Sequence, residues 1–433
     1  MKSLRGVLNN SLARNAGWMF VGQGLTFFIQ AASFVLLARM LGNIQYGIFA
    51  GAFALVSNLS PYTTLGSGMV FLRHVSANRT SFREYWANIL LSTFLAGTTL
   101  VVVSMRLGHW LLDAKSAAII GLIAIGECLC GRLVECAGQV FQAHEMLRVT
   151  ATLNTIVNLF RFALIATLFV TFRHIDVRTW AIASLCVSAL ALAVAVAVVT
   201  KRFGTPHFDL RLFGTKVLEG LGFSVSASTI SVYNDVDKTV LSHYRMAAAN
   251  GVYTIAYRAI DIGTIPIYSI YSATLPRAFK LGRNGITNVL PLGLKVLRRA
   301  ALFGGLAAIG MAAFAPVAPY FLGNTFVQSV SAIRWLCLIP LLRSLHLSAG
   351  LVLTGSGRHK YRTIAQVVAA AFNIGINLFL IPRYSWIGAA WASLLTDGSL
   401  AVMNWCLVGY FSRQITNTAL PAVASESSDQ IAA

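Results

Sequence analysis

The sequence of 433 residues is 57% hydrophobic and only 11% charged, whereas about 25% of the residues of soluble domains are charged. This composition excludes an ordinary soluble protein. Repeated apolar runs of about 20 residues are each long enough to cross a bilayer as a helix, and they predict an all-α polytopic membrane protein.

About twelve such runs follow one another along the chain. If the N-terminus is cytoplasmic, the inner loops and tails hold about 21 Lys and Arg residues and the outer loops about 7, which is the asymmetry of the positive-inside rule. The net charge of +20 therefore indicates orientation and attraction to anionic membrane lipids, and not nucleic-acid binding. The expected spans cover residues 15–41, 47–72, 84–107, 116–143, 150–172, 179–200, 217–244, 250–276, 296–322, 326–353, 361–381 and 386–411.

The expected domain organisation follows from one break in this pattern. Residues 201–216 contain Gly, Pro and several basic residues and are predicted to be a cytoplasmic linker. The linker separates an N-terminal six-helix lobe, residues 1–200, from a C-terminal six-helix lobe, residues 217–415. The polar tail, residues 416–433, is expected to be disordered and cytoplasmic.

The two halves of the chain resemble each other. A shift of 204 residues superposes Gly47 on Gly251, and the sequence of residues 154–160 matches that of residues 373–379. Six crossings separate the halves, so both begin on the same side of the membrane. They are therefore predicted to be parallel repeats related by an axis along the membrane normal, which is a design found in transporters.

Two polar stripes run through residues 223–276. Their members recur at steps of three and four, so each stripe shares one helical face. Charges facing lipid at the bilayer centre cost at least about 2.5–3.5 kcal/mol each, so the stripes are predicted to line a wet cavity. The alternative is that they hold helices together, with the i,i+3 pairs Asp235–Lys238 and Arg258–Asp261. The stripes consist of Ser224, Ser228, Ser231, Asp235 and Lys238, and of Tyr253, Tyr257, Asp261, Thr264, Tyr268 and Tyr271.

Several short motifs in order resemble the Wzx-type O-antigen and exopolysaccharide flippases, relatives of the multidrug and toxin extrusion transporters. The motifs are Leu36–Gly42 followed by Tyr46–Phe49, Asp237-Lys238 ahead of Gly251-Val252-Tyr253, and Gly357–Lys360 followed by Asn373, Asn377, Ile381-Pro382 and Gly388. The likeness extends to about Arg413. The lipid II flippases of the same superfamily carry cations in the first helix, whereas residues 17–38 have none.

The resemblance implies a V-shaped bundle of two lobes around a central cavity in the bacterial inner membrane, with cytoplasmic N- and C-termini. It implies transport of an undecaprenyl-pyrophosphate-linked oligosaccharide, an O-antigen or exopolysaccharide repeat unit, from the cytoplasmic to the periplasmic leaflet. This role also implies polysaccharide polymerase and chain-length proteins as partners.

Such a cargo requires cations for the phosphates and flat polar side chains for the sugars. The intramembrane cations include Arg132 and Arg343; the former is also a candidate partner of Glu135, and the latter lies near a helix end in an alternative interpretation. The residues expected to line the cavity are Arg161, Lys238, Arg258, Arg334, Tyr257, Tyr268, Asn158 and Ser231.

Four intramembrane acids, Glu127, Glu135, Asp235 and Asp261, are candidates for binding H⁺ or Na⁺ as a coupling ion. An inside-negative potential alone would also favour outward transfer of an anion, so a coupling ion is not required. No catalytic set, metal site or cofactor motif is recognised, and the six cysteines form no C-x-x-C pair.

Two other function classes remain open. An ion-coupled multidrug or metabolite exporter of the multidrug and toxin extrusion type would favour an acid-dominated cavity, but the intramembrane acids and bases are roughly balanced. A membrane enzyme such as an oligosaccharide polymerase would normally have a large periplasmic loop, and the expected outer loops are all short.

Overall fold

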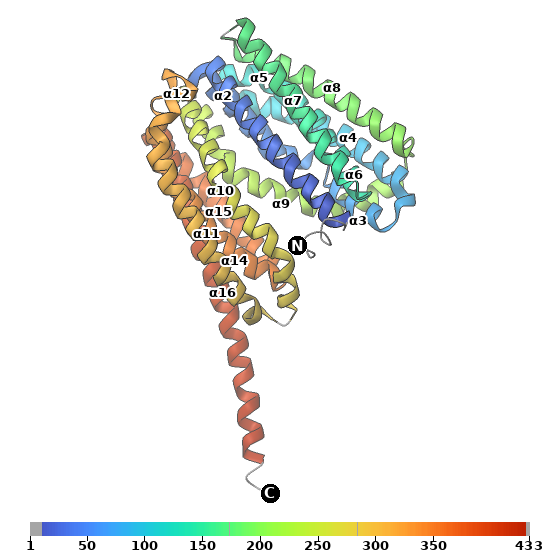
Figure 1. Cartoon of the computed structure of the whole chain (residues 1–433), viewed down its shortest axis with the longest axis vertical. Helices are drawn as coiled ribbons and strands as arrows, with labels where there is room; N and C mark the ends of the chain where they lie inside the picture. Colours follow the sequence, from blue (N-terminus) through green and yellow to red (C-terminus); the bar gives the residue numbers. More distant parts are fainter. Residues whose placement is uncertain (1–10, 173, 284, 430–433) are drawn as a thin grey trace, which may run out of the picture. The chain divides into compact units, whose positions relative to one another are not determined.

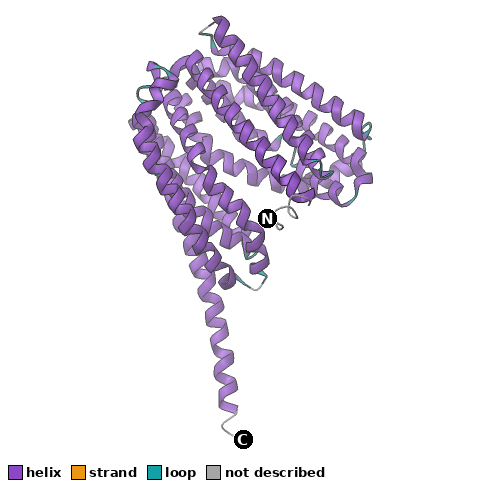
Figure 2. Cartoon of the chain, in the orientation of Figure 1, coloured by secondary structure: helices purple, strands orange, loops and turns teal. Residues whose placement is uncertain are grey.

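The computed structural model describes residues 11–172, 174–283 and 285–429 of the chain. Within these ranges the protein consists of helices and short loops, without a strand (Figure 2). Eight of the described helical stretches are long and apolar enough to cross a membrane. The all-helical, multi-span architecture predicted from composition is therefore confirmed.

The helices follow one another with short connections (Figure 1). The first half contains α2 (Ser11–Leu59), α3 (Ser67–Ala77), α4 (Phe82–Leu111), α5 (Ala114–Ala124), a π-helical segment (Ile125–Gly131), α6 (Arg132–Ala143), α7 (Leu147–Phe172) and α8 (Val177–Phe203). The second half contains α9 (Leu210–His243), α10 (Ala247–Gly282), α11 (Ile286–Phe314), α12 (Ala318–Leu322), α13 (Ser329–Leu336), α14 (Ile339–Gly355), α15 (His359–Tyr384) and α16 (Trp386–Asp429).

The first two expected spans, residues 15–41 and 47–72, have different bounds in the structure. Gly42 leaves the helical conformation, with φ of 69° and ψ of 173°, so α2 consists of two helices that meet at a kink where the sequence predicts a turn. A single glycine is enough to redirect a helix, because it has no Cβ to oppose positive φ. The second span ends early, at Leu59, because a short 3₁₀ turn, Ser60–Tyr62, that contains Pro61 follows it, and the left-handed Gly66 comes next.

Three of the expected spans, α9, α10 and α16, are helices but are not among the eight apolar stretches. Each carries charged residues in its central part. Asp235 and Lys238 lie on α9, Arg258 and Asp261 on α10, and Asp397 on α16.

The linker and the tail are more helical than predicted. α8 continues to Phe203 and α9 begins at Leu210, so only residues 204–209 of the expected linker form a loop. The tail expected to be disordered from residue 416 continues as helix α16 to Asp429, and residues 430–433 lie outside the described residues.

Packing divides the chain into two compact units. Unit 1 comprises Met1–Val252 and Pro319–Phe326, and unit 2 comprises Tyr253–Ala318 and Val327–Ala433. The division falls inside α10, whose first residues belong to unit 1. The charged residues of α9 therefore belong to unit 1, and those of α10 and α16 to unit 2.

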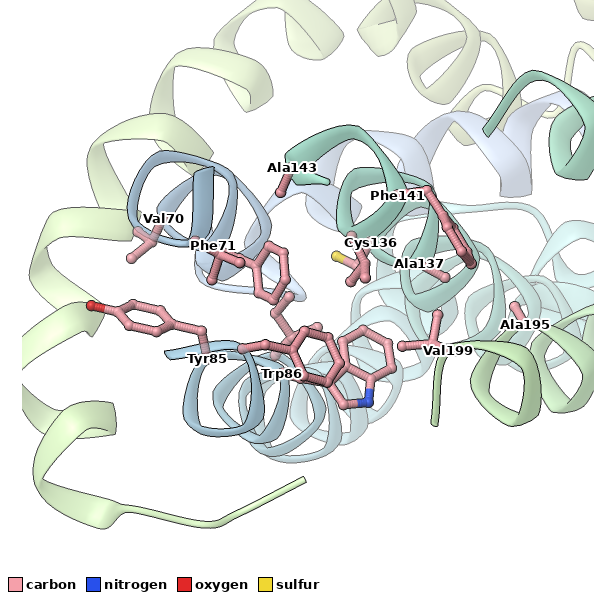
Figure 3. Packing of buried hydrophobic residues seen from close by; sticks show 14 residues of the cluster. Val70, Phe71, Tyr85, Trp86, Cys136, Ala137, Phe141, Ala143, Ala195 and Val199 are labelled. Atoms are coloured by element: carbon pink, nitrogen blue, oxygen red, sulfur yellow. The ribbon is translucent and has the colours of Figure 1, made fainter. Parts of the chain in front are cut away.

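The core of unit 1 includes a cluster in which α3, α4, α6 and α8 meet (Figure 3). Trp86 of α4 is fully buried there, with Phe71 of α3 and Phe141 of α6 around it. In a membrane such contacts stabilise mainly through van der Waals packing, because lipid tails are as apolar as the side chains. This cluster holds together the helices on one side of the polar cavity described below.

The backbones of α2 and α10 approach each other closely within unit 1. A Cβ atom placed on Gly251 would lie 2.0 Å from the carbonyl oxygen of Asn43, and one on Gly47 would lie 1.8 Å from that of Ala247. Side-chain carbons cannot occupy those positions, so both glycines are required by packing. These are the two glycines that the internal repeat superposes.

Candidate functional site

A polar cavity of about 500 Å³ lies inside unit 1. Its wall is formed by α2, the turn that follows it, the π-helical segment, α6, α7 and α8. The residues that line it are Thr26, Gln30, Phe53, Ser57, Ser60, Glu127, Cys130, Gly131, Arg132, Val134, Glu135, Asn154, Val157, Asn158, Arg161, Ser188 and Ala191. Two cations and two carboxylates therefore share this cavity with amides and hydroxyls.

The π-helical segment Ile125–Gly131 contributes Glu127, Cys130 and Gly131 to the cavity wall. Such segments are rare and occur frequently at functional sites. The wider turn changes the angular relation between residues before and after it, so that Glu127 lines the same cavity as Arg132 and Glu135 of the following α6.

Arg161 on α7 reaches across the cavity. One of its terminal nitrogens donates a hydrogen bond to Ser188 Oγ of α8 at 3.1 Å, and one lies 4.0 Å from a carboxylate oxygen of Glu127. Its buried Nε has no hydrogen-bond partner in the described part of the chain. A buried donor without a partner is costly, so this guanidinium has capacity left for an acceptor in the cavity.

Arg132 forms a tighter pair on the opposite side. It donates to Glu135 at 2.7 Å and to Ser60 Oγ at 2.9 Å. This is one of the structural pairs that sequence spacing predicts as an alternative to cargo binding. Both side chains still line the cavity.

Amides and hydroxyls join α2 to α7 along the same cavity. Gln30 Nε2 donates to Asn158 Oδ1 at 3.0 Å, and the hydroxyls of Thr26 and Thr155 lie 3.2 Å apart. Asn154, Asn158 and Arg161 all line the cavity, as expected for residues on one face of α7. Together these groups can bind a ligand that combines hydroxyls with negative charge.

Asp235 and Lys238 of α9 form an ion pair that is connected to the cavity by a hydrogen bond. Ser57, which lines the cavity, donates to the Asp235 carboxylate at 3.3 Å, and Asp235 pairs with the Lys238 ammonium. Lys238 is buried and also donates to the carbonyl oxygen of Asn234 at 3.1 Å. Ser231, half-buried on the same helix, donates to the carbonyl of Ala227 at 3.4 Å.

The predicted tyrosines of α10 differ in their surroundings. Tyr257 is buried in unit 2, where its hydroxyl donates to Ser393 Oγ of α16 at 3.3 Å, and Tyr253 contacts the same hydroxyl at 2.8 Å. Tyr268 is exposed on α10, and Arg334 is exposed on α13. Of the two tyrosines predicted to lie away from the span ends, Tyr257 is thus buried and Tyr268 exposed.

Unit 2 contains its own cluster of charges. Arg258 and Asp261 of α10 form the expected i,i+3 pair at 3.6 Å, with both side chains about half exposed. Arg343 of α14 lies 3.9 Å from Asp261 and 3.8 Å from Asp397 of α16. His346, also on α14, lies 3.5 Å from Asp397.

Asp397 is the residue of this cluster that the sequence analysis missed. It is the single acidic residue of the apolar stretch Trp386–Tyr410, and a lone carboxylate in such a stretch is itself a signal of a functional or paired site. Arg343, interpreted as lying near a helix end, is indeed in the second turn of α14. It is nevertheless buried between two carboxylates.

Comparison with known proteins identifies the family. The model of the polysaccharide biosynthesis protein family matches residues 12–281, which is more than half of the chain. The chain belongs to the polysaccharide biosynthesis protein family. No curated protein matches it at a significant level.

Solved structures of the MOP superfamily share the fold of this family member. A lipid II flippase MurJ in an inward closed conformation aligns with a TM-score of 0.73 and 14% identity over 90% of this chain and 87% of that one. An inward-facing multidrug resistance MATE transporter aligns with a TM-score of 0.72 and 14% identity over 90% and 96%. A MOP superfamily transporter from Pyrococcus furiosus Vc1 aligns with a TM-score of 0.60 and 15% identity over 94% and 98%.

These matches confirm the resemblance that the sequence motifs indicate. The protein is a member of the polysaccharide biosynthesis protein family with the fold of MATE and MurJ proteins, and eight of its described helical stretches are long and apolar enough to cross a membrane. The likeness to the solved structures, at 14 to 15% identity, concerns the fold, so the cargo has to be argued from this chain's own residues.

Proposed function

We propose that this family member is a flippase for an undecaprenyl-pyrophosphate-linked oligosaccharide, an O-antigen or exopolysaccharide repeat unit. It would move the cargo from the cytoplasmic to the periplasmic leaflet of a bacterial inner membrane by alternating access, with both termini in the cytoplasm. The lobes expected at residues 1–200 and 217–415 would be the moving parts, and polymerase and chain-length proteins would receive the product.

The observation that carries this proposal is the composition of the unit 1 cavity in a polysaccharide biosynthesis transporter. Moving a sugar pyrophosphate through hydrocarbon would strip water from its charges and hydroxyls, which costs several kcal/mol per ion even after relaxation. The cavity offers Arg132 and Arg161 for phosphate oxygens and amides and hydroxyls for sugar hydroxyls. Glutamine, asparagine, serine and threonine can both donate and accept hydrogen bonds, as can the sugar.

Arg161 is the first choice for the phosphate contact. At 4.0 Å its approach to Glu127 is longer than a hydrogen bond, and its Nε lacks a partner within the described residues. A planar guanidinium can hold two phosphate oxygens at once. Arg132, in contrast, is already hydrogen-bonded to Glu135 and Ser60, so it would have to exchange partners to reach the cargo.

The remaining predicted residues do not line the unit 1 cavity or are not the first choice for the phosphate, and this proposal gives them other roles. Lys238 and Asp235 would adjust the cavity through Ser57, while Arg258, Tyr257, Tyr268 and Arg334 of unit 2 would meet the cargo during its passage. The carboxylates of Glu127, Glu135, Asp235 and Asp261 are the candidates for binding H⁺ or Na⁺. Each is partly exposed and lies within 4.0 Å of a cation, as a site that changes charge during transport requires.

A multidrug or metabolite exporter is the second candidate, because MATE transporters share the fold. The two carboxylates of the cavity would suit a cationic drug, but both lie within ion-pair distance of an arginine. Drug susceptibility separates the two candidates. Deleting the gene should leave resistance to cationic drugs unchanged if the flippase proposal is right.

The decisive experiment replaces Arg161 in cells that depend on this transporter for surface polysaccharide. We expect Arg161→Ala to remove most surface polysaccharide and to leave its lipid-linked precursor on the cytoplasmic side. Arg161→Lys should keep part of the activity, because an ammonium retains the charge and loses the two-pronged geometry. Surface polysaccharide is measured by immunoblot, and the amount of protein in the membrane is measured in parallel.

Arg106→Ala is the matched control, since Arg106 is an exposed arginine of α4 outside the cavity lining. It should leave surface polysaccharide at the wild-type level. Lys238→Ala tests the link through Ser57 and Asp235, and a clear decrease is expected. Wild-type polysaccharide in Arg161→Ala, with normal protein in the membrane, would refute the assigned cavity.

A further inference from the structure

Carboxylates are scarce in unit 2. The sequence contains no Asp or Glu between Asp261 and Asp397, although twelve Lys and Arg residues occur in that stretch. Both carboxylates lie beside the same side chain, Arg343, at 3.9 Å and 3.8 Å. Both distances exceed the range of a hydrogen bond, so the guanidinium stands between two anions.

Burial distinguishes the two ends of this cluster. Arg343, His346 and Asp397 are each only 3 to 4% exposed, whereas the side chain of Asp261 is 49% exposed. Ions in a low-dielectric interior are costly unless their charges and hydrogen-bonding groups are satisfied. The buried end therefore has to hold its charge balance within a few side chains.

The hydrogen bonds at this buried end are incomplete. Oδ1 of Asp397 and Nε2 of His346 are 3.5 Å apart, and neither has a hydrogen-bond partner in the described part of the chain. Carboxylate Oδ1 is an acceptor, and Nε2 is an acceptor as well when it carries no proton. In the neutral tautomer that carries its proton on Nδ1, these two buried acceptors face each other without a hydrogen between them, and an unsatisfied buried polar group costs about 1–3 kcal/mol.

We propose that His346 and Asp397 form a proton-binding site in unit 2, and that the bound proton redistributes Arg343 between Asp397 and Asp261. The proton passes from hydronium to the Nε2 lone pair of His346, forming an N–H bond that points to Asp397. Asp397 then has a second cationic partner, and repulsion from the imidazolium moves Arg343 toward Asp261. Loss of the proton reverses this change.

The surroundings of His346 act on the proton in both directions. Burial of His346 opposes the added charge, Asp397 of α16, 3.5 Å from Nε2, attracts it, and Arg343 of α14, 3.8 Å from Asp397, repels it. Asp261 and Arg258 of α10 lie beyond Arg343 and pair with each other at 3.6 Å. Without the proton, the connected groups Arg258, Asp261, Arg343 and Asp397 carry two positive and two negative charges, and the proton adds one positive charge.

Other contacts keep the two proton ligands facing each other. Asn404 of α16 donates to the backbone carbonyl of His346 at 3.4 Å, and Trp405 donates to that of Leu345 at 3.0 Å. Tyr257 of α10 lies under the Arg343 guanidinium, 5.8 Å from ring centroid to Cζ. α10, α14 and α16 therefore all contact the cluster, so a shift of Arg343 changes contacts between helices.

This inference rests on the proposed transport function, to which it would add a coupling proton bound away from the cargo cavity. The test does not use the cargo, so the two proposals can fail independently. The purified full chain is labelled with ¹³Cε1-histidine in nanodiscs, and the imidazole signals are followed by NMR from about pH 5 to pH 8, the range in which histidine changes charge.

We expect the signal of His346 to change with pH in the wild-type protein. Asp397→Asn removes the carboxylate at 3.5 Å, and we expect it to lower the proton affinity of His346 at least about tenfold, since an adjacent opposite charge shifts such equilibria by one to three pH units. His346→Gln assigns the signal. His359→Gln is the matched control, because His359 lies at the exposed start of α15.

Three results would overturn the proposal. They are a His346 signal that does not change across this pH range, a titration that Asp397→Asn leaves unchanged, and a signal that responds at constant pH to NaCl but not to choline chloride, which would indicate Na⁺. If His346→Gln does not fold, variants of the seven other histidines assign the signal by elimination. Surface polysaccharide in His346→Gln cells then reports separately on the need for the proton in transport.

Discussion

The charges around the unit 1 cavity and the pair Arg343–Asp397 of unit 2 differ in burial. In unit 1, Glu127, Arg132, Glu135 and Arg161 surround a cavity, and each side chain is between 27 and 54% exposed. In unit 2, the charged side chains of Arg343 and Asp397 are 4 to 5% exposed. Partly exposed pairs gain about 0–1 kcal/mol and separate easily, whereas a buried ion that loses its partner is strongly destabilised. The unit 1 charges are therefore suited to exchange partners with a ligand, whereas Arg343 and Asp397 of unit 2 need a charged neighbour at all times, which Asp261 and His346 can also supply.

The largest effect should follow from breaking the buried cluster. Arg343→Ala leaves Asp397 without its cationic neighbour, and we expect a loss of about 3–5 kcal/mol of folding free energy, as for other buried pairs with one partner removed. The measurement is thermal unfolding of the purified protein in detergent. Arg258→Ala is the control, since this half-exposed arginine should contribute no more than about 1 kcal/mol. Equal losses in the two variants would contradict the comparison.

A smaller effect is expected from the backbone contact of unit 1. In Gly251→Ala the new methyl group would meet the carbonyl oxygen of Asn43 at 2.0 Å, so α2 and α10 have to move apart. Overpacking of this kind costs about 1–3 kcal/mol. Gly375→Ala on α15 is the control, because its Cβ would meet nothing within 4 Å. A Gly251→Ala protein as stable as Gly375→Ala would show that the contact is loose.

Replacing the cavity carboxylates should change stability less. Glu127→Gln and Glu135→Gln remove ion pairs at 4.0 Å and 2.7 Å, and each should cost no more than about 1 kcal/mol because water screens both. Unfolding is again measured in detergent, and Glu135→Gln should have the larger effect of the two. A loss of several kcal/mol in either variant would mean that the unit 1 pairs hold the fold, as those of unit 2 do.

The smallest effect concerns the connection between the cavity and α9. Ser57→Ala removes a hydrogen bond of 3.3 Å to Asp235, and bonds to charged groups contribute about 1.5–3 kcal/mol at best geometry. At this length we expect less than about 1 kcal/mol in stability. Transport should decline if the Asp235–Lys238 pair acts through Ser57. Ser269→Ala, whose exposed hydroxyl bonds within its own helix at 2.9 Å, should change neither stability nor surface polysaccharide.

The sequence predicted the helices, the family and three of the ion pairs. Periodicity and spacing are local properties, so Asp235–Lys238, Arg258–Asp261 and Arg132–Glu135, each at i,i+3, could be recognised in advance. The shared face of Asn158 and Arg161 on α7 followed from the same rule. These elements depend only on the geometry of a single helix.

Contacts between distant segments could not be predicted in this way. The pairing of Glu127 with Arg161 depends on the π-helical segment. No local sequence pattern predicted that segment. Arg343 and Asp397 are 54 residues apart in number, and only the packing of α14 against α16 brings them together. The predicted role of Tyr268 depends on which face of α10 is covered, and that is decided by neighbouring helices rather than by spacing.

The π-helical segment Ile125–Gly131 sets the register between α5 and α6. A π-turn accommodates one residue more than an α-turn, and helical residues follow one another at about 100° around the axis, given 3.6 residues per turn. If this segment relaxed to α-helical geometry, everything beyond it would rotate by about that angle, carrying Arg132 and Glu135 away from Glu127. A change of hydrogen-bond spacing within one helix would thus be enough to dismantle the cavity wall without unfolding anything.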